Sequence, residues 1–287
     1  HTGIHSFPTR RSSDLIMIVY GVAANVSIAK LFIAGVIPGL MLAALFMGYI
    51  IVWALFNKDK VPAADSELSF RAKLYESRHL IPVVSLIALV LGSIYSGLAT
   101  ATEAAAFGVA GSLLLSAIER SLSWQTFKDG LVAACRVYCM IGLILAGAAF
   151  LTLAMGFMGL PRHLAEFIGG LNLSPFVLIL MLTGFFIVLG CFLDGISMVV
   201  LTMAVLLPTV QKAGFDLIWF GIFIVLVVEM AQITPPVGFN LFVLQNLTRR
   251  EITYLARTAL PLFVLMLVAV LATYFIQDIV LWLPGHM

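Results

Sequence analysis

Charged residues are scarce in this chain. Asp, Glu, Lys and Arg make up 10% of its 287 residues, whereas they make up about a quarter of an ordinary globular domain. Hydrophobic residues make up 62%, and residues 80–94 and 220–228 carry no charge. A soluble globular domain is therefore excluded, and we expect most of the surface to face a lipid bilayer. The net charge of +2 is too small and too dispersed to indicate nucleic-acid binding.

Cysteine and the motifs of enzymes are equally sparse. The three cysteines, Cys135, Cys139 and Cys191, form no CxxC pair and lie in apolar sequence, which is typical of buried thiols without a metal or redox role. The sequence has no zinc-binding His/Glu spacing, no nucleotide-binding P-loop and no G-x-S-x-G elbow. We therefore expect neither enzyme activity nor a cofactor.

Residues 1–15 differ in composition from the rest of the chain. They lack the apolar region that a signal peptide needs. Residues 8–15 (PTRRSSDL) resemble translated sequencing-adapter sequence, so we set 1–15 aside as non-native in the fold prediction. Because an apolar segment then begins abruptly at Ile16, we expect that a natural N-terminal part precedes it.

Six apolar segments are candidates for membrane-spanning helices, each of which needs about 20 residues. They are residues 35–56, 79–98, 103–118, 137–158, 216–246 and 258–283. A seventh apolar segment, 176–210, is interrupted by Gly190, Asp194, Gly195 and Pro208. The expected fold class is an all-α polytopic membrane protein.

Basic residues indicate how these segments are oriented. Eleven of them lie in three connections, 57–78, 119–136 and 247–257. If 176–210 enters the membrane and returns while the other six segments cross, all eleven lie on one face, opposite Lys30, Arg162 and Lys212. A full crossing by 176–210 would change this split to eight against six. Because cytoplasmic loops carry the excess of Lys and Arg, we predict a re-entrant hairpin, a cytoplasmic 57–78 loop and an external C-terminus.

Two polar stretches interrupt the apolar segments. Residues 190–197 (GCFLDGIS) lie in the middle of 176–210, and residues 232–240 (QITPPVGFN) lie in the middle of 216–246. Consecutive prolines remove two backbone donors, so 216–246 is predicted to be a discontinuous helix. Non-helical backbone at membrane depth is tolerated only where it is buried in protein or lines a wet cavity. The alternative is that glycine and proline merely kink two helices.

The polar groups at both breaks suit an ion-coupled transporter. A broken helix exposes carbonyls and amides, which in transporters coordinate Na⁺ and anionic groups. Asp194 and Ser197 supply a carboxylate and a hydroxyl, while Thr234, Gly238 and Asn240 supply a hydroxyl, closely approaching backbone and an amide.

Three further polar residues have structural explanations. Thr100 and Glu103 fit a capping box that opens the 103–118 helix. Glu229 lies five residues before Thr234, and it either contributes to the site, pairs with a neighbouring helix or is protonated.

Residues 20–56 and 243–280 share a faint internal symmetry. Each has a polar turn, a short amphipathic stretch, a proline (Pro38 or Pro261) and an apolar span. An odd number of crossings separates the two, so their orientations are opposite, as an inverted repeat requires.

Four motifs identify a family that the chain resembles. They are residues 19–39 (VYGVAANVSIAKLFIAGVIPG), 92–106 (GSIYSGLATATEAAA), 190–194 (GCFLD) and 229–238 (EMAQITPPVG). Together they resemble, in order and over essentially all of 16–287, the large DctM-type membrane subunit of tripartite ATP-independent periplasmic (TRAP) transporters. Two positions depart from the family pattern: Ala231 stands where glycine is frequent, and Gln232 replaces a usual apolar residue.

The resemblance implies an elevator-type secondary transporter that takes up organic acids with Na⁺ across the bacterial inner membrane. Its expected partners are a small TRAP membrane subunit and a periplasmic substrate-binding protein. It also implies that 16–56 is the tail of a first repeat, 57–78 a cytoplasmic linker and 79–287 a full second repeat. The hairpin of the first repeat would precede residue 16, so this chain alone is not expected to transport.

Within that mechanism, Na⁺ is expected between the hairpin tip and the helix break. The expected Na⁺ ligands are Gly190, Asp194, Ser197, Thr234 and Gly238, and the expected substrate contacts are Thr234, Pro235, Pro236 and Asn240. Two alternatives stay open: a standalone ion-coupled carrier of organic anions, and a membrane scaffold or assembly protein that transports nothing.

Overall fold

The protein is described here by a computed structural model, which places residues 12–58, 81–159, 163, 166, 170, 174–234 and 239–286. The chain divides into two compact units. The first unit comprises residues 1–42 and 140–286, and the second unit comprises residues 43–139.

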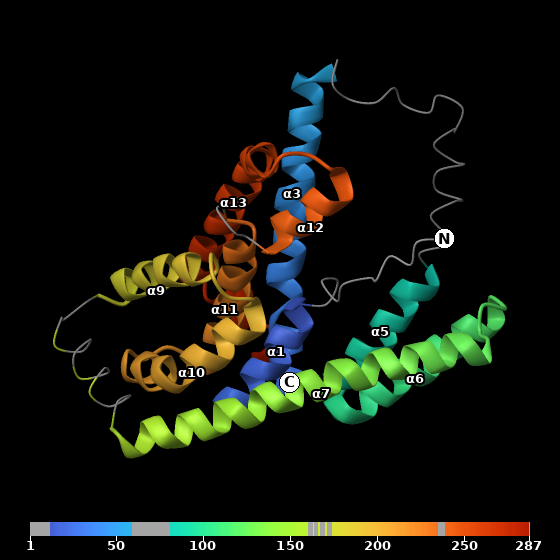
Figure 1. Ribbon diagram of the computed structural model, residues 1–287, viewed down its shortest axis with the longest axis horizontal. Coiled ribbons are helices and arrows are strands. Elements are labelled where there is room, and N and C mark those ends of the chain that lie inside the picture. The colour runs from blue at the N-terminus through green and yellow to red at the C-terminus, as the bar shows by residue number, and fades with distance from the viewer. Residues whose placement is uncertain are drawn as a thin grey trace. The chain divides into compact units, whose positions relative to one another are not determined.

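All regular elements within the described ranges are helical. They are α1 (Ser12–Ala24), α2 (Ile28–Ala34), α3 (Val36–Phe56), α5 (Ile81–Tyr95), α6 (Ala101–Ile118), α7 (Trp124–Phe157), α9 (Pro175–Leu189), α10 (Gly195–Lys212), α11 (Leu217–Gln232), α12 (Phe239–Thr248), α13 (Ile252–Phe275), α14 (Asp278–Leu281) and the 3₁₀ turn Pro284–His286 (Figure 1). Among the residues that the structure describes, four stretches are long and apolar enough to cross a membrane: Ile28–Phe56, Trp124–Phe157, Gly195–Lys212 and Ile252–Phe275. An all-α membrane protein is thus the fold class that length and composition support.

Helix α11 forms the core of the first unit. Thirteen of its sixteen residues are buried, and α1, α2, α9, α10 and α13 all pack on it. Two hydrogen bonds tie it to neighbours distant in sequence: Tyr20 Oη donates to the Leu217 carbonyl at 2.6 Å, and Trp219 Nε1 donates to the Thr273 carbonyl at 2.8 Å. A helix that is apolar on all sides is stable only when surrounded, which explains its central position.

The segment predicted as a hairpin, 176–210, consists of two helices. Helix α9 ends at Gly190 and α10 begins after Asp194. At about 1.5 Å per residue they are about 22 Å and 27 Å long, so α9 falls short of the roughly 30 Å hydrocarbon core of a bilayer. Helix 216–246 is likewise divided, since α11 ends at Gln232 and α12 begins at Phe239. Both predicted breaks are confirmed.

In the second unit, α5 and α6 pack on each other. Gly111 permits close approach, because a Cβ atom there would overlap Leu86 Cδ1. At the start of α6, the Thr100 backbone N–H donates to Glu103 Oε2 at 2.8 Å and the Glu103 N–H donates to Thr100 Oγ1 at 3.4 Å. These are the two bonds of the capping box expected from the sequence.

Helix α7 differs from the prediction. The span was expected at 137–158 after a loop, but the helix begins at Trp124, where Ser123 Oγ accepts from the Thr126 N–H at 3.1 Å and caps it. Two of the three basic residues that suggested a loop, Lys128 and Arg136, lie on this helix, whereas Arg120 lies in the turn before it. The expectation of buried thiols is wrong for Cys135 and Cys139, which are exposed because this part of α7 is exposed along most of its length.

Other boundaries differ in smaller ways. Helix α13 begins at Ile252 and ends at Phe275, whereas the expected span was 258–283. Helix α1 begins at Ser12, so it includes residues that the sequence led us to set aside. The predicted 57–78 linker lies almost entirely outside the described residues.

Candidate functional site

The N-terminus of α10 is organised by Asp194. Its Oδ2 accepts from the Ile196 N–H at 3.2 Å and from the Ser197 N–H at 3.3 Å, and the Ser197 hydroxyl donates to its Oδ1. Asp194 is therefore the N-cap of α10, a role that satisfies orphan amides at a helix start. From the sequence, this carboxylate was expected only as an ion ligand, although an aspartate before a new helix is the usual signal of an N-cap.

The tip of the α9–α10 hairpin lies against the end of α11. A Cβ atom at Gly190 would overlap that of Ala231 and lie 2.9 Å from its carbonyl carbon. A Cβ atom at Gly195 would overlap Gln232 Nε2 and lie 2.9 Å from Val228 Cγ1. The two predicted breaks, about forty residues apart in the chain, thus meet in the first unit, at the point where α9 and α10 join beside α11 (Figure 1). Only residues without side chains fit there.

Thr234 closes the end of α11 with its hydroxyl. Its Oγ1 donates to the Met230 carbonyl at 2.9 Å, and its backbone N–H donates to the Ala231 carbonyl at 3.2 Å. A hydroxyl that donates its one proton keeps its lone pairs available. The geometry therefore leaves an oxygen acceptor at the helix break.

The other predicted site residues fall into two groups. Pro235, Pro236 and Gly238 lie outside the described residues. Asn240 is half-buried in the first turn of α12, and Glu229 is half-buried on α11. Of the predicted Na⁺ ligands, the structure places Gly190 against Ala231, three residues before Thr234.

The helix ends give this junction a mixed polarity. The C-terminal ends of α9 and α11 present carbonyl groups, which carry partial negative charge and favour a cation. The N-terminal end of α10 presents amides, which favour an anion, and the Asp194 carboxylate already caps two of them. Both kinds of group lie within the junction, because Gly190 ends α9 and Gly195 begins α10.

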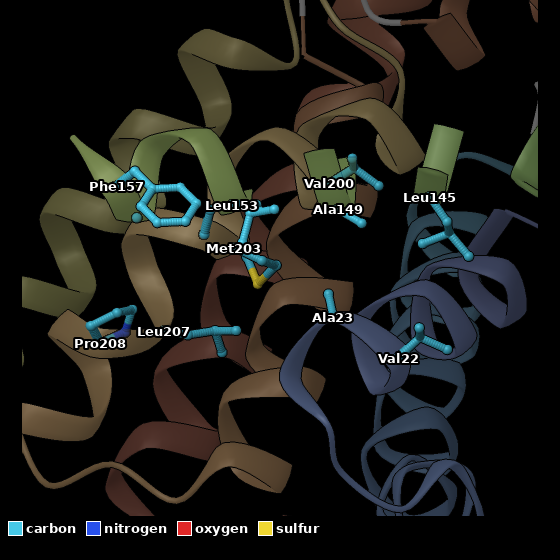
Figure 2. Close-up of a pocket in the computed structure, with 12 residues that line it drawn as sticks. Val22, Ala23, Leu145, Ala149, Leu153, Phe157, Val200, Met203, Leu207 and Pro208 are labelled. Carbon is cyan, nitrogen blue, oxygen red and sulfur yellow. The ribbon is translucent and has the colours of Figure 1, made fainter. Parts of the chain in front are cut away.

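An apolar cavity of about 740 Å³ lies elsewhere in the first unit. It is lined by side chains of α1, α7 and α10, among them Val22, Leu153, Phe157, Met203 and Leu207 (Figure 2). None of the lining residues that the structure describes is charged.

Comparison with known proteins decides the family. The family model for the tripartite ATP-independent periplasmic transporter DctM component matches residues 14–279. The chain belongs to this family. The match covers both helix breaks and the capping box, and it confirms the resemblance inferred from the four motifs.

Curated TRAP transporter permeases are similar over most of this chain. It is 32% identical over 272 residues to the isethionate TRAP transporter permease protein DctMQ of Oleidesulfovibrio alaskensis, covering 93% of this chain and 42% of that protein. It is 30% identical to the C4-dicarboxylate TRAP transporter large permease protein DctM of Pseudomonas aeruginosa, with coverages of 95% and 63%. It is 34% identical to the ectoine/5-hydroxyectoine TRAP transporter large permease protein UehC of Ruegeria pomeroyi, with coverages of 93% and 62%. The chain thus spans 42–63% of the length of these three relatives, all of which are named as permeases rather than enzymes.

Two residues at this DctM-family junction were not among the predicted site residues. Gly195 touches Gln232, and Gln232 is 3% exposed. The signal was present in the sequence, since Gln232 is a polar residue at the end of a mostly apolar helix.

Proposed function

We propose that this chain is the large permease subunit, or part of one, of a Na⁺-coupled TRAP transporter that takes up organic acids across the bacterial inner membrane. The family match and the permease relatives support the transport role. The proposed partners are a small membrane subunit and a periplasmic binding protein that delivers the acid.

One observation carries the ion-coupled part of the proposal. The hairpin tip is in contact with the end of α11, because two glycines of the tip lie against the last residues of that helix. Were these breaks only kinks, nothing would require them to meet. Convergence of two non-helical stretches is the arrangement in which membrane carriers bind ions and substrates.

The proposed Na⁺ position uses oxygen atoms on both sides of this contact. Thr234 Oγ1 donates its proton to the Met230 carbonyl, so its lone pairs remain available to a cation. The carbonyl ends of α9 and α11 add partial negative charge. Na⁺ binding would order the hairpin tip and complete an adjacent anion site.

The transport step follows the elevator scheme. Empty, the junction would expose polar groups that oppose movement through lipid. With acid and Na⁺ bound, those groups would be satisfied, and the mobile helices would slide past a fixed scaffold. Ligands can drive this shift only through different affinities for the two states.

The test is Na⁺-dependent stabilisation of the purified chain in nanodiscs. Thermal unfolding is followed in NaCl and in choline chloride of equal ionic strength. Thr234→Val removes the hydroxyl and should abolish most of the Na⁺-dependent rise in Tm. The matched control is Thr248→Val, because Thr248 Oγ1 makes the same bond to the carbonyl four residues earlier, at 2.7 Å, at the far end of α12.

If both variants lose the Na⁺-dependent rise in Tm equally, or if neither variant loses it, Thr234 is not a ligand of the ion site. An unchanged Tm of the unsubstituted protein on exchanging Na⁺ for choline would contradict Na⁺ coupling itself.

A further inference from the structure

The junction holds a side chain that the proposed ion site does not use. Gln232 is the last residue of α11 and is 3% exposed. Its Nε2 is the one side-chain nitrogen or oxygen atom, among those buried in the described part of the chain, that has no hydrogen-bond partner. Buried amides are nearly always paired, so this exception calls for a reason.

The position of Nε2 relative to α10 is well defined. It lies against Gly195, the first residue of α10, where a Cβ atom would overlap it. Val228 Cγ1 and Ile16 Cδ1 flank the same spot, each 2.9 Å from that Cβ position. Both of these neighbours are apolar side chains, so neither offers the amide a hydrogen-bond partner.

The chemistry of the unpaired atom selects the ligand. An amide N–H₂ group is a donor and has no lone pair to offer, so it cannot coordinate Na⁺. It lies against Gly195, the first residue of α10, and the first amides of that helix are already capped by the Asp194 carboxylate, so the donor itself selects the ligand. A donor requires an oxygen acceptor, and its hydrogen bond is strongest when that oxygen is charged.

We infer that Gln232 is a specificity-determining residue of this permease: its amide donates to an anionic oxygen, carboxylate or sulfonate, of the transported acid. The inference rests on the proposed function and adds a residue to its anion site. The oxygen reaches Nε2 when the hairpin tip separates from α11, because Gly195 closes the way to it in this structure. Both residues of the tip at this contact are glycines, so residues 190 and 195 have no side chains that must move when the tip separates.

Two opposite effects in one variant follow from this role. Gln232→Leu replaces an unsatisfied donor by an apolar group of similar size. The ligand-free protein should therefore unfold at a Tm about 2–4 °C higher. The same variant should bind the acid about tenfold more weakly, since a hydrogen bond to a charged group is lost. A residue with a merely structural role would not produce this pair of effects.

The experiment uses the purified chain in nanodiscs with three probes: succinate, isethionate and ectoine, each carrying an anionic oxygen. Tm is titrated against each probe in NaCl, for the unsubstituted protein, for Gln232→Leu and for Gln232→Glu. The matched control is Gln211→Leu, on the exposed end of α10. Gln232→Glu should also lose the response, because a carboxylate repels the ligand, whereas Gln211→Leu should keep it.

Three results would overturn the inference. The first is an unchanged probe response in Gln232→Leu or Gln232→Glu. The second is a lower ligand-free Tm for Gln232→Leu, which would show that the amide has a structural partner. The third is no response of the unsubstituted protein to any probe. The Na⁺ experiment tests the proposed function separately. If Thr234→Val abolishes the Na⁺ effect while substitutions of Gln232 leave probe binding unchanged, this inference is wrong and the proposed ion site is retained.

Discussion

At the scale of single residues, the contact between hairpin and α11 depends on a missing side chain. The backbone of residue 190 approaches Ala231 so closely that a Cβ atom there would overlap the Ala231 Cβ and lie 3.0 Å from its carbonyl oxygen. Since that second neighbour is backbone, it cannot rotate away. Gly190 is thus a packing requirement, whatever ligand binds nearby.

Gly190→Ala should therefore destabilise the first unit by about 1–3 kcal/mol through overpacking, measured as a fall in Tm. Ala231→Gly in the same chain should restore part of the loss, because it removes the nearest atom but not the carbonyl group. Gly184→Ala is the matched control: it lies on α9 with nothing within 4 Å of its Cβ position, and it should be neutral or slightly stabilising. Equal losses at 184 and 190 would attribute the effect to α9 itself rather than to the contact.

At the scale of elements, α11 is fixed at both ends by short-range bonds. Its N-cap Asp216 accepts from the Ile218 N–H at 2.7 Å and from the Trp219 N–H at 3.0 Å. Asp216→Ala should lower the free energy of unfolding by about 0.5–2 kcal/mol. Asp216→Asn should retain most of the stabilisation, because asparagine is also a good N-cap residue. The same substitution at Glu251, the N-cap of α13 that makes no side-chain cap bond, should change Tm little. A larger effect at Glu251 than at Asp216 would contradict this assignment.

The same scale shows what the sequence could predict. The breaks at 190–194 and after Gln232 were predictable, because glycine, aspartate and consecutive prolines act locally on the backbone. The first turns of α7 were not predictable, since basic residues indicate that a segment lies at the membrane edge but do not indicate whether its backbone is helical. The contact of Gly190 with Ala231 was expected only as convergence of two regions, because the packing of distant helices has no local signal.

At the scale of the whole molecule, the sequence predicts that the α9–α10 hairpin returns to the side it entered. That topology places eleven basic residues together, and the short α9 agrees with a helix that does not reach the opposite surface. The alternative is that α10, with 18 residues, crosses fully.

Single cysteines at the two ends of the hairpin separate these topologies. In a chain carrying Cys135→Ser, Cys139→Ser and Cys191→Ser, residues Ser174 and Gln211, both exposed, are replaced in turn by cysteine, as is Thr248 at the end of α12. A membrane-impermeant maleimide applied to bacterial spheroplasts should label the cysteines at 174 and 211 and should reach that at 248 only after lysis. If α10 crosses, the cysteines at 174 and 248 share one side and that at 211 lies on the other. That labelling pattern would mean that the basic residues are not concentrated on one face of the membrane. It would also contradict the re-entrant hairpin, since Gly190 and Asp194 would then lie within a broken helix that crosses the membrane.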